Sequence, residues 1–305
     1  MRYRITLIFM LALFVSVQLC AMFLSTFYPS DMGAFENQDD PLNPLIYVVM
    51  VLIMTALVLV MLKLGLQKVI KAIFLFAVAI TSVFVLLPLI YQIYPNGDVA
   101  VLVSLLIGIA LALALLLRPE WYVINLVGFI VGVGAAVVLG ISLGILPVLI
   151  LLILLGVYDA ISVYRTKHMI RLAEGMVPLR LPIMFVVPKD KDFTLDGLST
   201  KPLTEVSPEE RGAMFMGVGD AVIPSILSVA VLLTLPSTSH SFQNANLIVA
   251  LGTLLGSVVG FLILMGYVAK GKPQAGLPLL NGGAILGFLI TYMLVFRDFN
   301  FGIVV

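Results

Sequence analysis

Charged residues are scarce in this chain. Of its 305 residues, 11% are charged and 62% are hydrophobic. A soluble domain usually carries about 25% charged and about 45–50% apolar residues. A folded chain of roughly 300 residues still exposes about a quarter of its unfolded surface, so this much apolar surface cannot be hidden from water. The composition excludes a soluble globular protein and predicts a polytopic membrane protein that faces lipid.

Residues for metal and redox chemistry are equally few. The chain has one cysteine, Cys20, so an intramolecular disulfide is excluded. Its two histidines, His168 and His240, lie in different loops without the spacing of metal ligands. The sequence has no glycine-rich nucleotide fingerprint and no basic stripe with interleaved aromatics. We therefore expect no metal, no cofactor and no nucleic-acid partner.

Apolar segments long enough to cross a bilayer follow one another along the chain. A hydrocarbon core about 30 Å thick takes about 20 residues of helix. The break between the fifth and sixth segments is marked only by Gly140, Gly144 and Pro147. The sequence predicts an all-α membrane protein with nine transmembrane helices, near 5–27, 43–63, 69–94, 98–117, 121–140, 143–172, 212–236, 245–268 and 276–296.

Basic residues assign the two sides of the membrane. With a cytoplasmic N-terminus, every Lys and Arg except Arg297 falls in a cytoplasmic loop or beside one. Cytoplasmic loops are enriched in Lys and Arg. We therefore expect a multi-pass protein of the cell membrane, with the N-terminus and the 173–211 loop in the cytoplasm and the C-terminus outside.

The long polar segment divides the chain into a six-helix half at 1–172, a cytoplasmic loop at 173–211 and a three-helix half at 212–305, which together form one functional unit. In the loop, "IMFVV" at 183–187 is consistent with a short strand or with a linker. Ser207, with Glu210 three residues later, has the spacing of a capping box. It predicts a helix entry, with the seventh span beginning near residue 212.

Two carboxylates lie inside apolar segments. Asp159 and Asp220 are placed about 9 and 14 Å from the cytoplasmic ends of consecutive antiparallel helices, at 1.5 Å per residue. Intramembrane acids are costly and usually functional. The polar end of the sixth segment, from Tyr164 to Leu172, is expected to extend as helix out of the bilayer. No Lys, Arg or His then lies deep enough in a span to neutralise the two acids, which excludes a structural ion pair. The structural alternative is a protonated acid bonded to Tyr158 or Tyr164.

Two carboxylates at close range can divide acid and base chemistry between them. Like charges a few ångström apart cannot both ionise, so one group acts as a base and the other as an acid. That combination activates water and protonates a carbonyl oxygen, as in aspartic proteases. A proton- or cation-coupled transporter is the alternative use of the acids. A third possibility, a non-catalytic scaffold, predicts that neutralising them does little.

Three short motifs occur in order on the sixth, seventh and ninth segments. They are YD at Tyr158–Asp159, GxGD at Gly217–Asp220 and PxL at Pro278–Leu280. Together they resemble the presenilin and signal peptide peptidase family of GxGD intramembrane aspartyl proteases, with an archaeal-type presenilin homologue as the nearest kind. The middle of PxL is Leu279 where the family usually has Ala. Asn281 stands near the position of a second proline of presenilins.

The resemblance implies that Asp159 and Asp220 are catalytic. It further implies that substrate-binding residues flank them: Tyr158, Gly217, Gly219, Pro278, Leu279 and Leu280. The implied substrates are single-span membrane proteins or signal peptides, cleaved inside the bilayer. Whether the chain forms a homo-oligomer is left open.

A protease in lipid must also unwind its substrate helix. The freed N–H and C=O groups then need new partners, because lipid offers none. Addition of the substrate as a strand to an enzyme edge would supply them. The candidate edges are residues 183–187 and the backbone before Leu280.

Overall fold

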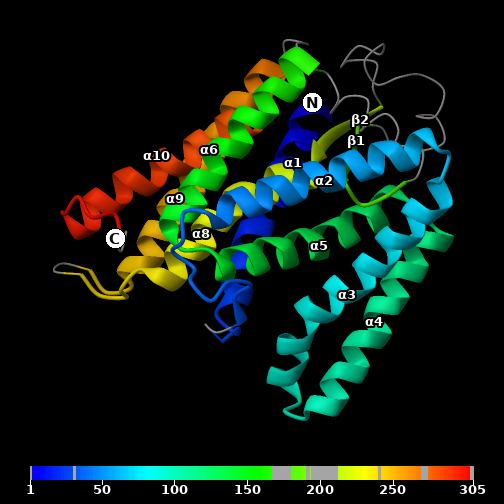
Figure 1. Cartoon of the computed structure of the whole chain (residues 1–305), viewed down its shortest axis with the longest axis horizontal. Helices are drawn as coiled ribbons and strands as arrows, with labels where there is room; N and C mark the ends of the chain where they lie inside the picture. The colour runs from blue at the N-terminus through cyan, green and yellow to red at the C-terminus, as the bar shows by residue number, and fades with distance from the viewer. Residues whose placement is uncertain are drawn as a thin grey trace. The chain divides into compact units, whose positions relative to one another are not determined.

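The computed structural model describes residues 2–29, 32–166, 180–189, 193, 212–239, 242–268 and 274–302, and most of them are helical (Figure 1). A π-helical turn, η2, spans Ser162–Thr166 and follows the helix that ends at Ile161. The elements are α1 Arg2–Ser25, α2 Asn43–Lys63, α3 Gln67–Ile93, α4 Gly97–Leu117, α5 Trp121–Ser142, α6 Ile145–Ile161, β1 Met184–Pro188, β2 Ala213–Gly217, α8 Val218–Thr234, α9 Ala245–Val268 and α10 Leu277–Phe296.

The predicted helices are confirmed in number and order. Among the described residues, eight helices are long and apolar enough to cross a membrane, counting α6 together with most of its π-helical turn. The ninth, α8, is apolar but has only 17 residues. The weakly marked break between the fifth and sixth spans falls at Leu143–Gly144, where Gly144 is the N-cap of α6.

The predicted start of the seventh helix is wrong. Residues 213–217 form β2, which pairs antiparallel with β1 so that Met184 lies opposite Gly217. The pairing partner lies about 30 residues earlier in the chain, and no local pattern shows it. Of the two interpretations of "IMFVV", the strand is confirmed. The predicted cap at Ser207 and the helical continuation at 167–172 lie outside the described residues.

The described residues form two compact units, each made of separate stretches of chain. The first unit draws on 1–14, 52–134 and 167–219, and the second on 15–51, 135–166 and 220–305. Four of the five boundaries between them fall inside α1, α2, α5 and α8, and the fifth falls at the end of η2. The division into two membrane halves and a loop stays a prediction.

In the first unit, one face of α5 supports the two-stranded sheet. The Asn125 Nδ2 donates to the backbone oxygen of Val186 at 2.8 Å, and Asn125 Oδ1 accepts from the Val186 N–H at 2.8 Å. Gly128 lies three residues later on the same face. A methyl group there would meet the Phe185 ring at 3.6 Å, so the glycine lets the sheet approach the helix.

In the second unit, glycines bring α9 and α10 together, side by side (Figure 1). A methyl group on Gly256 would overlap the carbonyl oxygen of Gly283, and one on Gly260 would overlap that of Leu279. Small residues permit such backbone contact between helices in lipid, where the hydrophobic effect does not drive association. This packing fixes the start of α10 against α9.

Candidate active site

Asp159 lies near the C-terminal end of α6 and is 7% exposed. The helix widens directly after it, and the Ser162 N–H bonds to the backbone oxygens of both Asp159 and Tyr158. One turn before Asp159, Gly156 lies against the start of α10, since a methyl group there would sit 3.7 Å from Pro278 Cα. The absence of a side chain at Gly156 therefore lets α10 begin beside Asp159.

Asp159 supplies the cap that α10 lacks. The N-cap residue is Gly276, which has no side chain, and Pro278 has no N–H. The Leu277 N–H donates to Asp159 Oδ2 at 3.1 Å. The first N–H groups of a helix have no partner within it, and its N-terminus carries partial positive charge. A carboxylate from another helix satisfies both requirements here.

Asp220 lies beside the same segment. It is the third residue of α8, where an acid is favourable for the helix dipole, and it is half-buried. A methyl group on Gly276 would lie 3.5 Å from Asp220 Oδ1. The two carboxyl groups therefore flank Gly276–Leu277 and are, by bond geometry, no more than about 10 Å apart.

Tyr164, in the π-helical turn, holds the chain that leads into α10. Its hydroxyl donates to Gln274 Oε1 at 2.6 Å and accepts from the Ala275 N–H at 3.3 Å. Tyr164 was one of the two tyrosines considered above as a partner for a protonated acid. In the structure its hydroxyl bonds instead to the segment before Gly276. The turn after Asp159 and the start of α10 are connected twice, through Asp159 and through Tyr164.

The three PxL residues have different surroundings. Pro278 is exposed in the first turn of α10, and Leu279 is half-buried. Leu280 is fully buried, with its Cα close to Gly260 of α9. The motif thus combines an exposed proline beside Asp159 with a leucine that packs the helix pair.

The remaining expected site residues lie beside the aspartates in the chain. Tyr158 is half-buried on α6, and Gly217 is the last residue of β2. Gly219 is exposed, and an added methyl group there would meet nothing within 4 Å. Within the described residues, no group of three or more His, Cys, Asp or Glu is placed to hold a metal ion.

Sequence reasoning missed the role of Gly276 and Leu277 and the amide of Asn281. The Asn281 Nδ2 donates to the backbone oxygen of Leu152 at 2.8 Å, two turns before Asp159. Its Oδ1 is buried and has no hydrogen-bond partner among the described residues. The available signal was the sequence Gly-Leu-Pro, a helix start that cannot cap itself and therefore needs an acceptor from elsewhere.

Comparison with known families decides the class of this protein. The sequence matches the family described as "Signal-peptide peptidase, presenilin aspartyl protease" over residues 11–297. The chain belongs to this family. No protein of curated function matches the sequence at a significant level.

Solved structures agree with this membership. The presenilin-family chain resembles a presenilin family intramembrane aspartate protease solved in space group C222, with 35% identity, a TM-score of 0.69 and coverage of 95% of this chain and 99% of that one. A second structure of such a protease, in space group P2, has 36% identity, a TM-score of 0.66 and coverage of 94% and 97%. The chain is thus an aspartic-type intramembrane endopeptidase, and the transporter alternative is not supported.

Proposed function

We propose that Asp159 and Asp220 are the catalytic pair of this endopeptidase. The observation that carries the proposal is the meeting of both carboxyl groups at Gly276–Leu277. One carboxylate takes a proton from water as the oxygen attacks the substrate carbonyl carbon, and the other protonates the carbonyl oxygen. When the C–N bond then breaks, the first carboxyl group gives the proton that it took from water to the departing amine, and the second recovers its proton from a hydroxyl of the intermediate. The Leu277 amide holds the Asp159 carboxyl in a fixed orientation throughout.

We assign substrates to the class of single-span membrane proteins and signal peptides, cleaved within their apolar segments. Both aspartates lie on apolar helices, so the peptide bond must reach them in the membrane. The distribution of Lys and Arg supports a cell-membrane protein with a cytoplasmic N-terminus and 173–211 loop and an external C-terminus.

The sheet offers one edge for an unwound substrate. The Lys189 N–H bonds to Gly212 O and the Val218 N–H bonds to Ile183 O. Opposed residues of an antiparallel pair alternate between bonded and non-bonded, so Val186 and Phe215, which face each other, point their backbone groups outward.

The two outward edges differ. On β1, the Asn125 amide occupies both backbone groups of Val186, which closes that edge. On β2, no described group bonds to the backbone of Phe215. We therefore propose β2, and not the 183–187 edge expected from the sequence, as the strand that pairs with substrate. Gly217, the last residue of β2, is three residues before Asp220, so covalent linkage alone keeps the end of this strand within about 10 Å of the Asp220 backbone, and Phe215 within about 17 Å.

The catalytic assignment is tested with the full-length protein in liposomes that contain a single-span substrate. Asp159→Asn and Asp220→Asn should each reduce cleavage by at least about 1000-fold, because each removes one half of the acid–base pair. Asp98→Asn, at an exposed acid in the first turn of α4, is the control and should cleave normally. Mass spectrometry should place the cut inside the apolar segment. Cleavage that persists in either variant would overturn the assignment.

The edge is tested separately by Phe215→Pro. Proline removes an N–H that makes no bond to β1, so the ladder between the strands is kept. Cleavage should fall by at least about tenfold, which corresponds to roughly one lost hydrogen bond to substrate. Phe215→Leu, which keeps the N–H, should remain near the native rate. Equal rates for the two variants would exclude this edge.

A further inference from the structure

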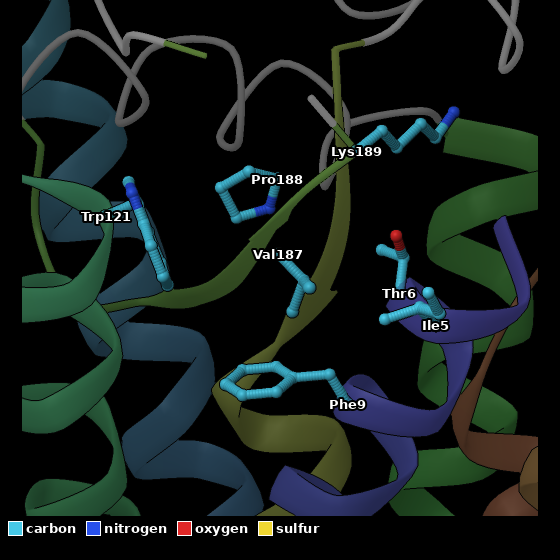
Figure 2. A pocket seen from close by; sticks show the side chains of 7 residues that line it. All are labelled: Ile5, Thr6, Phe9, Trp121, Val187, Pro188 and Lys189. Atoms are coloured by element: carbon cyan, nitrogen blue, oxygen red, sulfur yellow. The ribbon is translucent and has the colours of Figure 1, made fainter. Parts of the chain in front are cut away.

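A pocket of about 380 Å³ lies in the first unit beside the end of β1 (Figure 2). Three elements that are far apart in the sequence meet there: the start of α1, the first residue of α5, and the last residues of β1 with the one that follows. The catalytic proposal uses none of these side chains. The pocket is lined by Ile5, Thr6, Phe9, Trp121, Val187, Pro188 and Lys189.

The lining combines apolar walls with one cationic group. Five of the seven side chains are apolar or aromatic, and no acid is among them. The Lys189 ammonium and the Thr6 hydroxyl lie on one side, and the indole of Trp121 lies across from them (Figure 2). A lysine carries its charge on a long apolar stem, so it can contact a chain and a head group at once. The chemistry fits a ligand with an apolar tail and an anionic head.

The two helix ends that line the pocket, at the start of α1 and the start of α5, have the features of a membrane interface. Trp121 is the single tryptophan of the chain, and tryptophan is enriched at membrane–water interfaces. Arg118 closes α4 three residues earlier, and Arg4 precedes Ile5 on α1. Anionic lipids of the cytoplasmic leaflet are attracted to such basic positions. An anionic phospholipid is therefore the partner whose chemistry and location both fit.

We propose that this pocket binds an anionic phospholipid, with the phosphate at Lys189 and an acyl chain along Phe9, Trp121 and Val187. The residues that line the pocket do not include the proposed catalytic residues, so the lipid proposal does not depend on the catalytic assignment. It predicts a lipid preference that originates from one lysine.

The single tryptophan makes the test direct. The full-length protein is placed in vesicles in which phosphatidylglycerol or phosphatidylcholine carries bromine on its chains, and quenching of Trp121 fluorescence is measured. One lysine near the membrane surface attracts an anionic lipid by about 1 kcal/mol. We therefore expect the pocket to prefer the anionic lipid over phosphatidylcholine by about fivefold. Lys189→Gln should reduce the preference to about one. Lys68→Gln, at an exposed lysine in the first turn of α3 outside the pocket, should keep it.

Further controls show whether the lipid preference has another cause than a phospholipid bound in this pocket. Inorganic phosphate at constant ionic strength should leave the preference unchanged, because it lacks the acyl chain. Loss of the preference with free phosphate would indicate an anion site only and overturn the lipid proposal. Equal quenching by both lipids in the native chain would overturn it as well. A preference that survives in Lys189→Gln, with a native circular dichroism spectrum, would place the lipid at Arg118 or elsewhere and equally exclude this pocket.

Discussion

The two compact units use different contacts to hold their functional parts. In the second unit, α9 and α10 meet through glycines and backbone carbonyls, and the start of α10 is bonded to Asp159. In the first unit, a sheet of two strands rests on α5 through the amide of Asn125. Backbone contact leaves no side chain that can adjust, whereas a side-chain amide can be removed without steric conflict. The start of α10, to which Asp159 is bonded, is thus held by close packing against α9, and the sheet is held against α5 by hydrogen bonds.

The largest expected effect on stability is at the glycines of α9. Gly256→Ala and Gly260→Ala should each destabilise the protein by on the order of 3 kcal/mol, because the added methyl meets α10 backbone that cannot move aside. Thermal unfolding in detergent, followed by circular dichroism, measures this. Gly266→Ala is the matched control on the same helix, since nothing lies within 4 Å of the added methyl. It should be neutral or slightly stabilising. Equal melting temperatures for the three variants would contradict the packing described.

The next largest effect is expected at Gly276, where a substitution should change the cleavage rate without changing the stability of the fold. Gly276→Val should reduce cleavage by about 100-fold, because the branched side chain extends toward the Asp220 carboxyl and a displacement of about 1 Å has that cost. Gly276→Ala makes only ordinary contacts, and the backbone at 276 is in the right-handed helical region. We expect the alanine variant to keep most of the activity and both variants to melt like the native chain. Unchanged cleavage by the valine variant would separate Gly276 from the reacting groups.

In the first unit, Asn125→Leu removes two hydrogen bonds from a strand residue, Val186, that is 4% exposed. We expect a loss of about 2 kcal/mol in unfolding free energy, because the two backbone groups are left buried without partners. Asn246→Leu is the comparison in the second unit, where the amide makes one bond to Leu232 O. Its loss should be about half as large. A loss at Asn246 equal to or above that at Asn125 would mean that the amide does not hold the sheet.

The smallest effect is expected at Asn281. Asn281→Leu removes one bond to Leu152 O and also removes a buried oxygen that has no partner among the described residues. These changes oppose each other, so stability should change by less than about 1 kcal/mol. Cleavage should change by less than about threefold if the amide serves α6–α10 packing alone. A tenfold loss of cleavage at native stability would show instead that Oδ1 takes part in the reaction.

Much of the fold could be predicted because the bilayer constrains it. A helix satisfies the hydrogen bonds of its own backbone, so a long apolar segment in lipid must be helical. The positions of the helices can therefore be predicted from the apolar segments. The start of α8 could not be predicted, because "AMFMG" is as apolar as a helix and becomes a strand only by pairing with "MFVVP". The two aspartates were visible as acids in apolar surroundings. Their contact with Gly276–Leu277 was not, since the Leu277 N–H could have bonded to any acceptor.

The sequence by itself determined that this is a polytopic membrane protein, that its helices follow in this order, and that Asp159 and Asp220 are its intramembrane acids. These properties follow from local composition, because burial of charge in lipid is costly at each position independently. Tertiary structure alone decided that both carboxyl groups meet at one helix start, that Asn125 closes β1, and that the backbone of Phe215 on β2 has no bonding partner among the described residues. These depend on pairings between residues distant in the chain, and such pairings leave no local pattern.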